Sequence, residues 1–598
     1  MKKIFNFLLC LCFFSANAQQ INSGPLVGGV TPSSARIYYR TNVSANFNIE
    51  VDLDTLFNNP QIFNCTTSSN SNNVIIKDVT GLLSNQKYYY RAEINNNYHT
   101  IGSFKTFPNE GVSGNYKVVV GSCNYHDHWS GGGALSPDSY FNDILFNSIV
   151  DFDPYVVLHL GDWNYPSTAF GWDYNLNDSL VAESFSLRYQ DYNMLNYIMP
   201  NLPIDYIYDD DYSQNNSAGW TYPTINSAND SLGNPYFILD DPSMPNGIRT
   251  GAIEGYFTNF PGYPQTDTSA IHHSFKLGNI EFFVLDTRLS KDPIHEVFVF
   301  DSTTLTYSFN PPQGHSTLGE TQKNWLLNGL SSSNADWKVI CSSVVFNKQF
   351  TTLLPILINK QPDNKELIKF AADLAYMWAG YPEDMDDLLN TINDQNIENV
   401  IMLSGDTHSS MMDDGTNSGI PELSASGWAA GNEGVLNYTI DSIALDIGIP
   451  NFVETVLWNG GGNGINNINF SDTYGTLEFF STDSLRMCIK DEFNQLLSCQ
   501  TIPFGNSTAI TRKYIPQNDL LLVYPNPAKN SLKCVVSETY TSSKIRIEIY
   551  SMDGMKKVAE EFIDSNNIII SLKDINKGTY VLQLTSKNQT LQKKFIKH

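Results

Sequence analysis

The sequence is short of positive charge. Lysine and arginine together number 36, against 62 aspartate and glutamate residues, which gives a formal net charge of −26 at pH 7. A surface of this sign repels nucleic acid and anionic lipid at long range, so we expect no nucleic-acid-binding surface. Phosphate chemistry remains compatible with this charge if bound metal ions reverse the sign of the field locally.

Long apolar runs are also scarce. The run at residues 4–14 is too short to cross a bilayer, and no later stretch approaches the roughly 20 apolar residues of a membrane helix, so we expect no transmembrane segment. Two lysines precede this run, and a small-x-small cleavage site ends at Ala18. This pattern predicts a signal peptide over residues 1–18 and an exported mature protein.

Cysteine is infrequent for an exported chain. Of eight cysteines, two fall within the predicted signal peptide, and six scattered cysteines are too few for a disulfide scaffold. Cys488 and Cys499 flank a charged, turn-like stretch. They either pair across a hairpin or are two half-buried strand residues.

The pattern of residues divides the chain into several parts, as expected for a length that exceeds one hydrophobic core. Residues 19–110 show short strands between Asn-, Ser- and Gly-rich turns, which indicates a β-sandwich of fibronectin or immunoglobulin type. Residues 111–505 alternate short apolar strands with helical stretches, which is typical of an α/β domain. Residues 506–518 look like a linker, and residues 519–598 form a separate small unit with alternating strands.

Residues of the types that commonly bind metals follow four of the predicted strands in the α/β domain. Ligands of such sheets bind beyond the carboxyl ends of the strands. Adjacent glycines are expected to allow a sharp exit from the strand. Each strand end alone would more often be a turn or a solvated loop, but four in one domain favour a site. The candidates are Cys123, Asn124, Asp162, Tyr165, Asp209, Asp210, Asp211, Asp406 and His408.

The chemistry of these residues fits a two-metal site. Carboxylates bridge cations, while thiolate, phenolate and imidazole suit a transition metal such as iron or zinc. Two cations about 3.5–4 Å apart can clamp a phosphoryl group and lower the pKa of a bridging water. Asp406 and His408 are two residues apart in an extended segment, so both side chains can reach the same site.

Several ordered motifs resemble those of the PhoD-like alkaline phosphatase and phosphodiesterase family, and the resemblance covers about residues 20–505. It implies a four-layer α/β/β/α metallophosphoesterase domain with two or more metal ions, iron plus calcium, with zinc, manganese or magnesium as alternatives. The motifs are Gly-Ser-Cys-Asn at 121–124, Gly161-Asp162 with Tyr165, Leu-Asp-Thr-Arg at 285–288, Leu318-Gly319-Glu320 with Gln322 and Trp325, Gly-Tyr-Pro at 380–382, and Gly-Asp-Thr-His at 405–408.

The same resemblance implies roles for the candidate ligands. Cys123, Asp162 and Tyr165 would bind the iron-like metal, with Asp162 as the bridge between the two metals. The remaining ligands would be Asp209, Asp406 and His408, with a contribution from Asn124.

One departure from the family pattern bears on the chemistry. The family has an Asp-Asp-His-Asp run where residues 208–211 read Tyr-Asp-Asp-Asp, so Asp210 takes the place of the histidine. That histidine is expected to contact the phosphate or assist the leaving group. A carboxylate there repels phosphate unless it is protonated or metal-bound, and crowding by two neighbouring aspartates would favour a protonated Asp210 that acts as an acid. Arg288 follows a strand and is either a phosphate contact or part of a structural ion pair.

The small C-terminal unit resembles a type IX secretion sorting domain. The motifs are Val-Tyr-Pro-Asn-Pro at 523–527, Tyr-Ser-Met-Asp-Gly at 550–554 and Gly-Thr-Tyr-Val-Leu at 578–582. The resemblance implies a small β-sandwich that the type IX machinery recognises, and a protein exported through the periplasm and outer membrane to be secreted or held at the cell surface. Taken alone, the unit could equally be an adhesive β module.

These inferences combine into one expected function. The chain is expected to be a secreted metal-dependent phosphoric ester hydrolase that uses a metal-activated hydroxide on an extracellular phosphomonoester or phosphodiester, to scavenge phosphate. A nearer alternative is a diesterase for teichoic acid or phospholipid head groups. A more distant one is a non-enzymatic surface binding protein on a decayed phosphatase fold.

Overall fold

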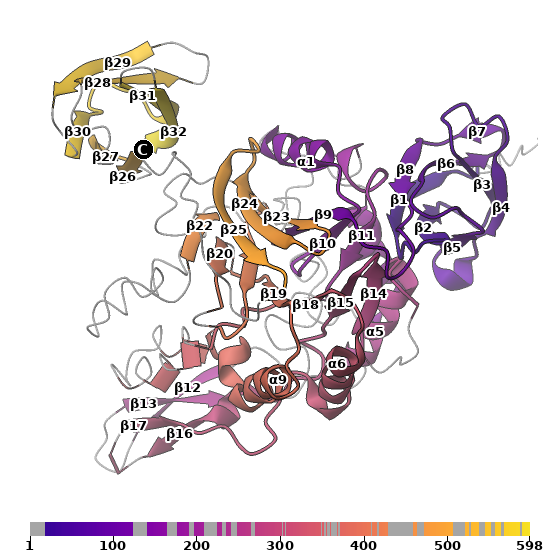
Figure 1. Cartoon of the computed structure of the whole chain (residues 1–598), viewed down its shortest axis with the longest axis horizontal. Helices are drawn as coiled ribbons and strands as arrows, with labels where there is room; N and C mark the ends of the chain where they lie inside the picture. Colours follow the sequence, from indigo (N-terminus) through magenta and orange to yellow (C-terminus); the bar gives the residue numbers. More distant parts are fainter. Residues whose placement is uncertain are drawn as a thin grey trace, which may run out of the picture.

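The structure is a computed structural model that contains two small all-β units and a larger α/β unit between them in the chain (Figure 1). It describes residues 18–597 except for the following segments: 124–139, 164–175, 190–195, 209–223, 230–234, 241–247, 265–269, 302, 305, 349, 352–353, 356–358, 360–367, 369–370, 373, 408, 416–417, 429–457, 463–471, 506–520, 525–527, 537–543, 552–555, 564–566 and 587–588.

The first unit consists of two antiparallel sheets. One sheet has the order β1-β2-β5, and the other has the order β4-β3-β6-β7, with β8 also paired to β6. Alternate residues of β3 and β6 are buried, as expected for strands with one face on a core. The strands are β1 (Ile21–Gly28), β2 (Ser34–Thr41), β3 (Asn46–Asp52), β4 (Gln61–Thr66), β5 (Val74–Thr80), β6 (Lys87–Ile94), β7 (Asn97–Tyr98) and β8 (Gly102–Lys105), with the 3-10 helix η1 (Ser69–Ser71).

The first central sheet joins distant parts of the chain. Its order is β11-β10-β9-β23-β24-β25, in which β9, β10 and β11 are parallel and the last three strands are antiparallel. Figure 1 shows β9 next to β23. The strands are β9 (Asn115–Gly121), β10 (Val156–His159), β11 (Ile204–Tyr206), β23 (Thr473–Phe480), β24 (Ser484–Asp491) and β25 (Leu496–Pro503).

The second central sheet has seven strands in the order β14-β15-β18-β19-β21-β20-β22. The four strands from β15 to β21 are parallel, so their carboxyl ends meet at one edge. The strands are β14 (His273–Leu277), β15 (Ile280–Val284), β18 (Trp337–Cys341), β19 (Val400–Ser404), β20 (Ser409–Asp413), β21 (Glu422–Ala425) and β22 (Trp458–Gly462). Two hairpins lie outside this sheet: β12 (Thr224–Asn229) with β13 (Pro235–Asp240), and β16 (Phe298–Asp301) with β17 (Thr306–Phe309).

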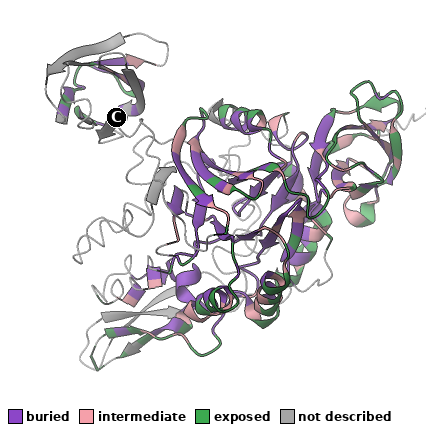
Figure 2. Cartoon of the chain, in the orientation of Figure 1, coloured by how far each residue is buried: buried purple, intermediate pink, exposed green. Residues whose placement is uncertain are grey.

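Strands β10 and β11 of the first sheet and β18, β19 and β21 of the second are buried on both faces, and they are purple in Figure 2. Val118 and Val120 of the first sheet share a core with Phe282 of the second sheet and with the N-terminal unit. Val119 points the other way, into a core with helices, and Ile340 of the second sheet lies in another helix-lined core. The helices are α1 (Tyr140–Phe152), α3 (Asp178–Arg188), α5 (Ile248–Asn259), α6 (Gly319–Ser332) and α9 (Pro382–Asp394), with the 3-10 helices η5 (Ile294–Val297) and η6 (Trp378–Gly380).

The N-terminal unit packs directly on the α/β unit. The hydroxyl of Tyr90 and the backbone N–H of Ser103 both donate to the carbonyl of Pro200, at 3.1 and 2.8 Å. In the other direction, the hydroxyl of Tyr263 donates to the carbonyl of Val30 at 2.8 Å. Because the two units also share an apolar core, they are joined over a continuous interior.

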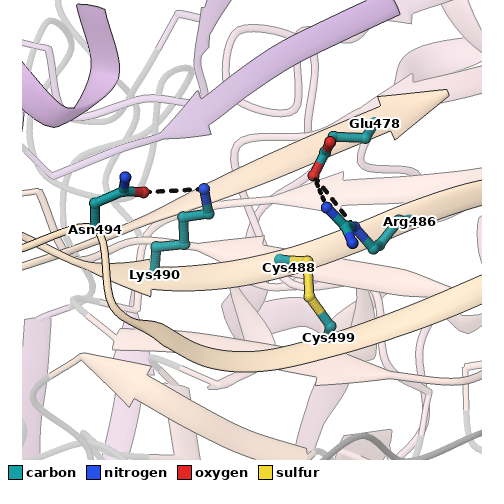
Figure 3. The surroundings of a disulfide bond; sticks show 6 residues. All are labelled: Glu478, Arg486, Cys488, Lys490, Asn494 and Cys499. Carbon is teal, nitrogen blue, oxygen red and sulfur yellow. Dashed lines mark hydrogen bonds and ion pairs between the residues drawn. A yellow bond between two sulfur atoms is a disulfide. The ribbon is translucent and has the colours of Figure 1, made fainter. Parts of the chain in front are cut away.

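Cys488 and Cys499 form a disulfide between β24 and β25 (Figure 3). The two residues are directly opposite in the strand register, with their Cα atoms 4.1 Å apart. Of the two alternatives left open by the sequence, the structure has the paired one. The other cysteines among the described residues, at positions 65, 123, 341 and 534, are buried.

The C-terminal unit has its own apolar core and two antiparallel sheets, with the orders β26-β27-β30 and β29-β28-β31-β32. No helix in the described parts of the chain is long and apolar enough to cross a membrane. The strands are β26 (Leu521–Tyr524), β27 (Ser531–Val536), β28 (Lys544–Ser551), β29 (Lys556–Ile563), β30 (Asn567–Ser571), β31 (Gly578–Ser586) and β32 (Gln589–Lys597).

Candidate functional site

Three of the predicted site residues follow the carboxyl ends of strands in the central sheets. Cys123 follows β9, Asp162 follows β10 and Asp406 follows β19. All three have positive φ angles, of 58°, 53° and 76°. Non-glycine residues seldom adopt this left-handed conformation, and such strained residues cluster at functional sites. The local backbone therefore directs each candidate ligand away from the course of its strand.

The glycines beside these residues serve two different purposes. Gly161 has a φ of 112° and makes the sharp exit that the sequence suggested. At Gly121 the reason is close packing, because a Cβ atom there would lie 1.7 Å from Nε1 of Trp428. At Gly405 a Cβ atom would lie 2.6 Å from the carbonyl oxygen of Leu160. The expected role as a turn residue is thus wrong for Gly121 and Gly405, where the absence of a side chain lets neighbouring segments approach.

Cys123 and Asp162 are in direct contact. The thiol of Cys123 donates to Oδ2 of Asp162 at 3.1 Å, and both residues are buried. Metal–sulfur and metal–oxygen bonds are about 2.3 and 2.1 Å long, so donors this far apart subtend about 90° at a shared cation. A thiolate and a carboxylate also form a donor set suited to a transition metal. The two residues therefore fit a shared metal ion.

Asp406 is held by a buried arginine. The guanidinium of Arg288 donates through a terminal nitrogen to Oδ1 of Asp406 at 2.6 Å, and its Nε donates to the hydroxyl of Ser343 at 3.3 Å. The Arg288 side chain is 0% exposed and that of Asp406 is 15% exposed. The ion pair that the sequence left open for Arg288 is therefore present, and its contact with phosphate stays a prediction.

The loop that carries Arg288 is itself fixed by hydrogen bonds. The backbone N–H groups of Arg288 and Leu289 donate to Oδ1 of Asp286 at 3.0 and 2.8 Å. The side chain of Gln322, on α6, accepts from the N–H of Asp286 and donates to its carbonyl. Helix α6 thus positions Asp406 through Asp286 and Arg288.

Ser426 is a site residue that the sequence reasoning missed. Its hydroxyl lies 2.9 Å from Sγ of Cys123, immediately after β21. Ser426 could be predicted as a site residue only if residues 422–425 were predicted to form a strand, because ligands bind beyond strand ends. Their sequence, Glu-Leu-Ser-Ala, lacks the β-branched and aromatic residues that indicate one.

A buried carboxylic acid beside the site was missed for the same reason. Glu422 accepts hydrogen bonds from the N–H of Phe346 at 2.8 Å and from the hydroxyls of Ser404 and Ser418 at 2.7 and 3.2 Å. Burial raises the pKa of Glu422 to about 7, although these hydrogen bonds oppose the shift. Glu422 therefore links β21 to the end of β19, two residues before Asp406.

His159 is a core histidine in the apolar strand β10. Its ring packs edge-on against Trp163 and Trp428, with centroids 4.8 and 5.1 Å away. Burial lowers its pKa well below the usual value, so the ring is neutral. Neither ring nitrogen of His159 has a hydrogen-bond partner among the described residues.

The other predicted site residues lie outside the described residues. These are Asn124, Tyr165, Asp209, Asp210, Asp211 and His408. Within the described part of the chain, no group of three or more His, Cys, Asp or Glu residues is placed to hold a metal. What the structure brings together is the contact of Cys123 with Asp162 and the contact of Asp406 with Arg288.

Comparisons with known proteins identify two parts of the chain. Residues 119–433 match the family model of the PhoD-like phosphatase. Residues 522–598 match the secretion system C-terminal sorting domain.

Individual proteins are also similar to this chain. Alkaline phosphatase D of Bacillus subtilis (strain 168) is 25% identical over 350 residues, which cover 56% of this chain and 53% of that protein. The match thus spans about half the length of the relative. The solved structure of PhoD has a TM-score of 0.58 at 16% identity and covers 82% of this chain and 91% of its own, so the fold is shared. Purple acid phosphatase PPD1 from yellow lupin seeds gives a TM-score of 0.45 at 11% identity, over 81% of this chain and 74% of its own.

Proposed function

The chain belongs to the PhoD-like phosphatase family, and from this premise we propose that it is a secreted metal-dependent hydrolase of phosphoric esters. The observation that carries the proposal is the buried contact between Cys123 and Asp162, whose donor atoms fit one transition-metal ion. The extracellular substrate is a phosphomonoester or a phosphodiester, and its hydrolysis releases phosphate for uptake.

The proposed metal ligands are those that the sequence indicated. Cys123 and Asp162 would hold an iron ion, with calcium as the second cation. The ligand set is completed by Asn124, Tyr165, Asp209, Asp406 and His408. When bound, such a pair of cations stabilises the charge of the transferring phosphoryl group and supplies an activated water.

The surrounding residues would hold this arrangement in place. Arg288 fixes one oxygen of Asp406, which leaves the other oxygen free to turn toward the site. The indole of Trp428 packs against Gly121 and fills space beside the loop that carries Cys123, which excludes water from behind the ligands. Both effects keep the ligands in one geometry before substrate binds.

Asp210 keeps its predicted role as the proton donor to the leaving group. The variant Asp210→Asn has no proton to give, so kcat should fall by about 100-fold for an alkyl phosphate. The fall should be much smaller for p-nitrophenyl phosphate, whose leaving group needs no proton. Equal effects on both substrates would contradict the role.

The architecture and export of the protein form part of the same proposal. The division of apolar side chains between two sheets and two sets of helices supports a four-layer α/β/β/α arrangement for residues 111–505. Residues 19–110 would be a β-sandwich domain and residues 506–518 a linker. The C-terminal sorting domain supports export by type IX machinery, through the periplasm and outer membrane.

The proposal is tested by hydrolysis of p-nitrophenyl phosphate and bis-p-nitrophenyl phosphate, with elemental analysis of protein purified without chelators. Asp162→Ala and Asp406→Ala should lose both turnover and metal, whereas the exposed control Asp483→Ala should keep both. The ratio of the two activities would assign the protein as a monoesterase or a diesterase. Absence of metal and turnover in the unmodified protein would refute the proposal and favour a non-enzymatic binding protein.

A further inference from the structure

Two serine hydroxyl groups lie near the sulfur of Cys123. Oγ of Ser426 lies 2.9 Å from Sγ, and Oγ of Ser122 lies 3.4 Å from it. We propose that Ser426 is a positioning residue whose hydroxyl donates a hydrogen bond to the Cys123 thiolate and thereby tunes the metal that this sulfur binds. The inference rests on the proposed function, because it requires Cys123 to be a metal ligand.

The direction of this hydrogen bond follows from the chemistry of the sulfur. A cysteine that binds a metal is deprotonated, so its sulfur has no proton to donate. A proton shared with Ser426 therefore belongs to the serine hydroxyl. Ser122 is a weaker candidate, because its hydroxyl is farther from the sulfur and also donates to the carbonyl of Ala425 at 3.4 Å.

The backbone around Ser426 is fixed on its C-terminal side by two hydrogen bonds. The N–H of Trp428 donates to the carbonyl of Ser122 at 3.2 Å, which ties the segment to the loop that carries Cys123. The N–H of Thr473, in β23, donates to the carbonyl of Gly427 at 2.7 Å. On its N-terminal side Ser426 continues directly from β21, and its side chain is buried. The hydroxyl is therefore positioned by the fold rather than by the chance rotation of an exposed side chain.

A hydrogen bond to a ligating sulfur withdraws electron density from it. Hydrogen bonding around cysteine ligands is one of the means by which proteins set the reduction potential of iron–sulfur and copper centres. Without the Ser426 hydroxyl, the sulfur would donate more strongly to its metal. The higher oxidation state would then be stabilised, and sulfur-to-metal charge transfer would need less energy.

The test uses the full-length protein loaded with Co²⁺, whose thiolate charge-transfer band reports on the sulfur. Ser426→Ala should shift this band to longer wavelength, and the same variant loaded with iron should have a lower reduction potential. Ser424→Ala is the matched control, because Ser424 is a buried serine of β21 whose hydroxyl has no hydrogen-bond partner in the structure. Its band should stay at the position of the unmodified protein.

Several outcomes would overturn the inference. An unchanged band in Ser426→Ala, or an equal shift in Ser424→Ala, would show that the hydroxyl does not act on the sulfur. A larger shift in Ser122→Ala would show that Ser122, and not Ser426, donates the hydrogen bond to Cys123. Circular dichroism checks that each variant is folded like the unmodified protein when its charge-transfer band is measured.

Failure of this inference can be told apart from failure of the proposed function. If the unmodified protein shows a band that disappears in Cys123→Ala, then Cys123 is a ligand and only the role of Ser426 is at stake. If the unmodified protein binds Co²⁺ without such a band, Cys123 is not a ligand and the inference fails, whereas the proposed hydrolase is judged separately by its turnover of the two phosphate esters.

Discussion

Cys123, Asp162 and Asp406 are each constrained twice, by a left-handed backbone and by a hydrogen bond of the side chain. The sequence predicted these residues because a glycine and a metal-binding residue follow an apolar strand. It did not predict Ser426 as a contact of Cys123, because a serine after a weak strand pattern carries no such signal. It also could not choose between the two roles of Arg288, since an ion pair with Asp406 depends on contacts between distant segments.

Removal of Arg288 tests the strength of that ion pair. Arg288→Ala leaves Asp406, whose side chain is 15% exposed, without its fully buried partner, so unfolding should become easier by about 3–5 kcal/mol. Arg486→Ala is a control, because Arg486 forms a partly exposed pair with Glu478 and should cost less than about 1 kcal/mol (Figure 3). Urea unfolding of the three proteins measures both effects. An equal decrease in the free energy of unfolding in both variants would show that burial does not strengthen the Arg288–Asp406 ion pair.

At the scale of elements, the strands and helices of the α/β unit were largely predictable. The sequence predicted that strands alternate with helices over residues 111–505, and α1 (Tyr140–Phe152) and α9 (Pro382–Asp394) are two of the helices that lie between those strands. Strand β21 was not predicted, because its residues are buried by pairing with β19 and β20 and by the hydrogen bonds of Glu422. Such contacts depend on the tertiary structure and leave no period in the sequence.

Glu422 makes the stability of this strand depend on pH. The pKa of Glu422 in the folded protein is about 7, above the 4.5 of an unperturbed glutamate. The contribution of protonated Glu422 to the free energy of unfolding is therefore fully present below about pH 4.5 and is lost as pH rises through 7. Glu422→Gln removes the cost of charging the buried group. The variant should therefore gain up to roughly 3 kcal/mol relative to the unmodified protein between pH 5 and pH 9.

Urea midpoints at these two pH values measure the gain. Glu320→Gln, at an exposed position of α6, should show no comparable gain. If the midpoints of Glu422→Gln and the unmodified protein changed in parallel with pH, Glu422 would not be the titrating group.

At the scale of the whole molecule, the two central sheets are joined by a buried pair at their edges. Nε2 of His273, in β14, lies 2.9 Å from Oδ2 of Asp205, in β11. Burial alone would lower the pKa of His273, but the charge and hydrogen bond of Asp205, with the carbonyl of Ile271, raise it above the usual value. The pair therefore stabilises the packing of one sheet on the other when His273 is protonated.

The pKa of His273 is raised by its ion pair, whereas that of Glu422 is raised by burial. The stability from His273 is fully present below the unfolded pKa of about 6.5 and is lost as pH rises through the higher folded pKa. His273→Gln should therefore lower Tm most at pH 6 and less at higher pH. Thermal unfolding at pH 6 and pH 9 measures the difference, and a loss of Tm that does not change with pH would contradict it.

The pairing of β9 with β23 has a consequence for how the protein is made. Val120 is opposite Gly475 in the register, so the strand that leads to Cys123 receives this neighbour only after most of the chain has left the ribosome. At typical rates of synthesis the interval is about 20 to 70 s. During that time an apolar strand edge stays unpaired, which favours the binding of chaperones and delays the completion of the site. Completion of the site therefore waits for the synthesis of β23.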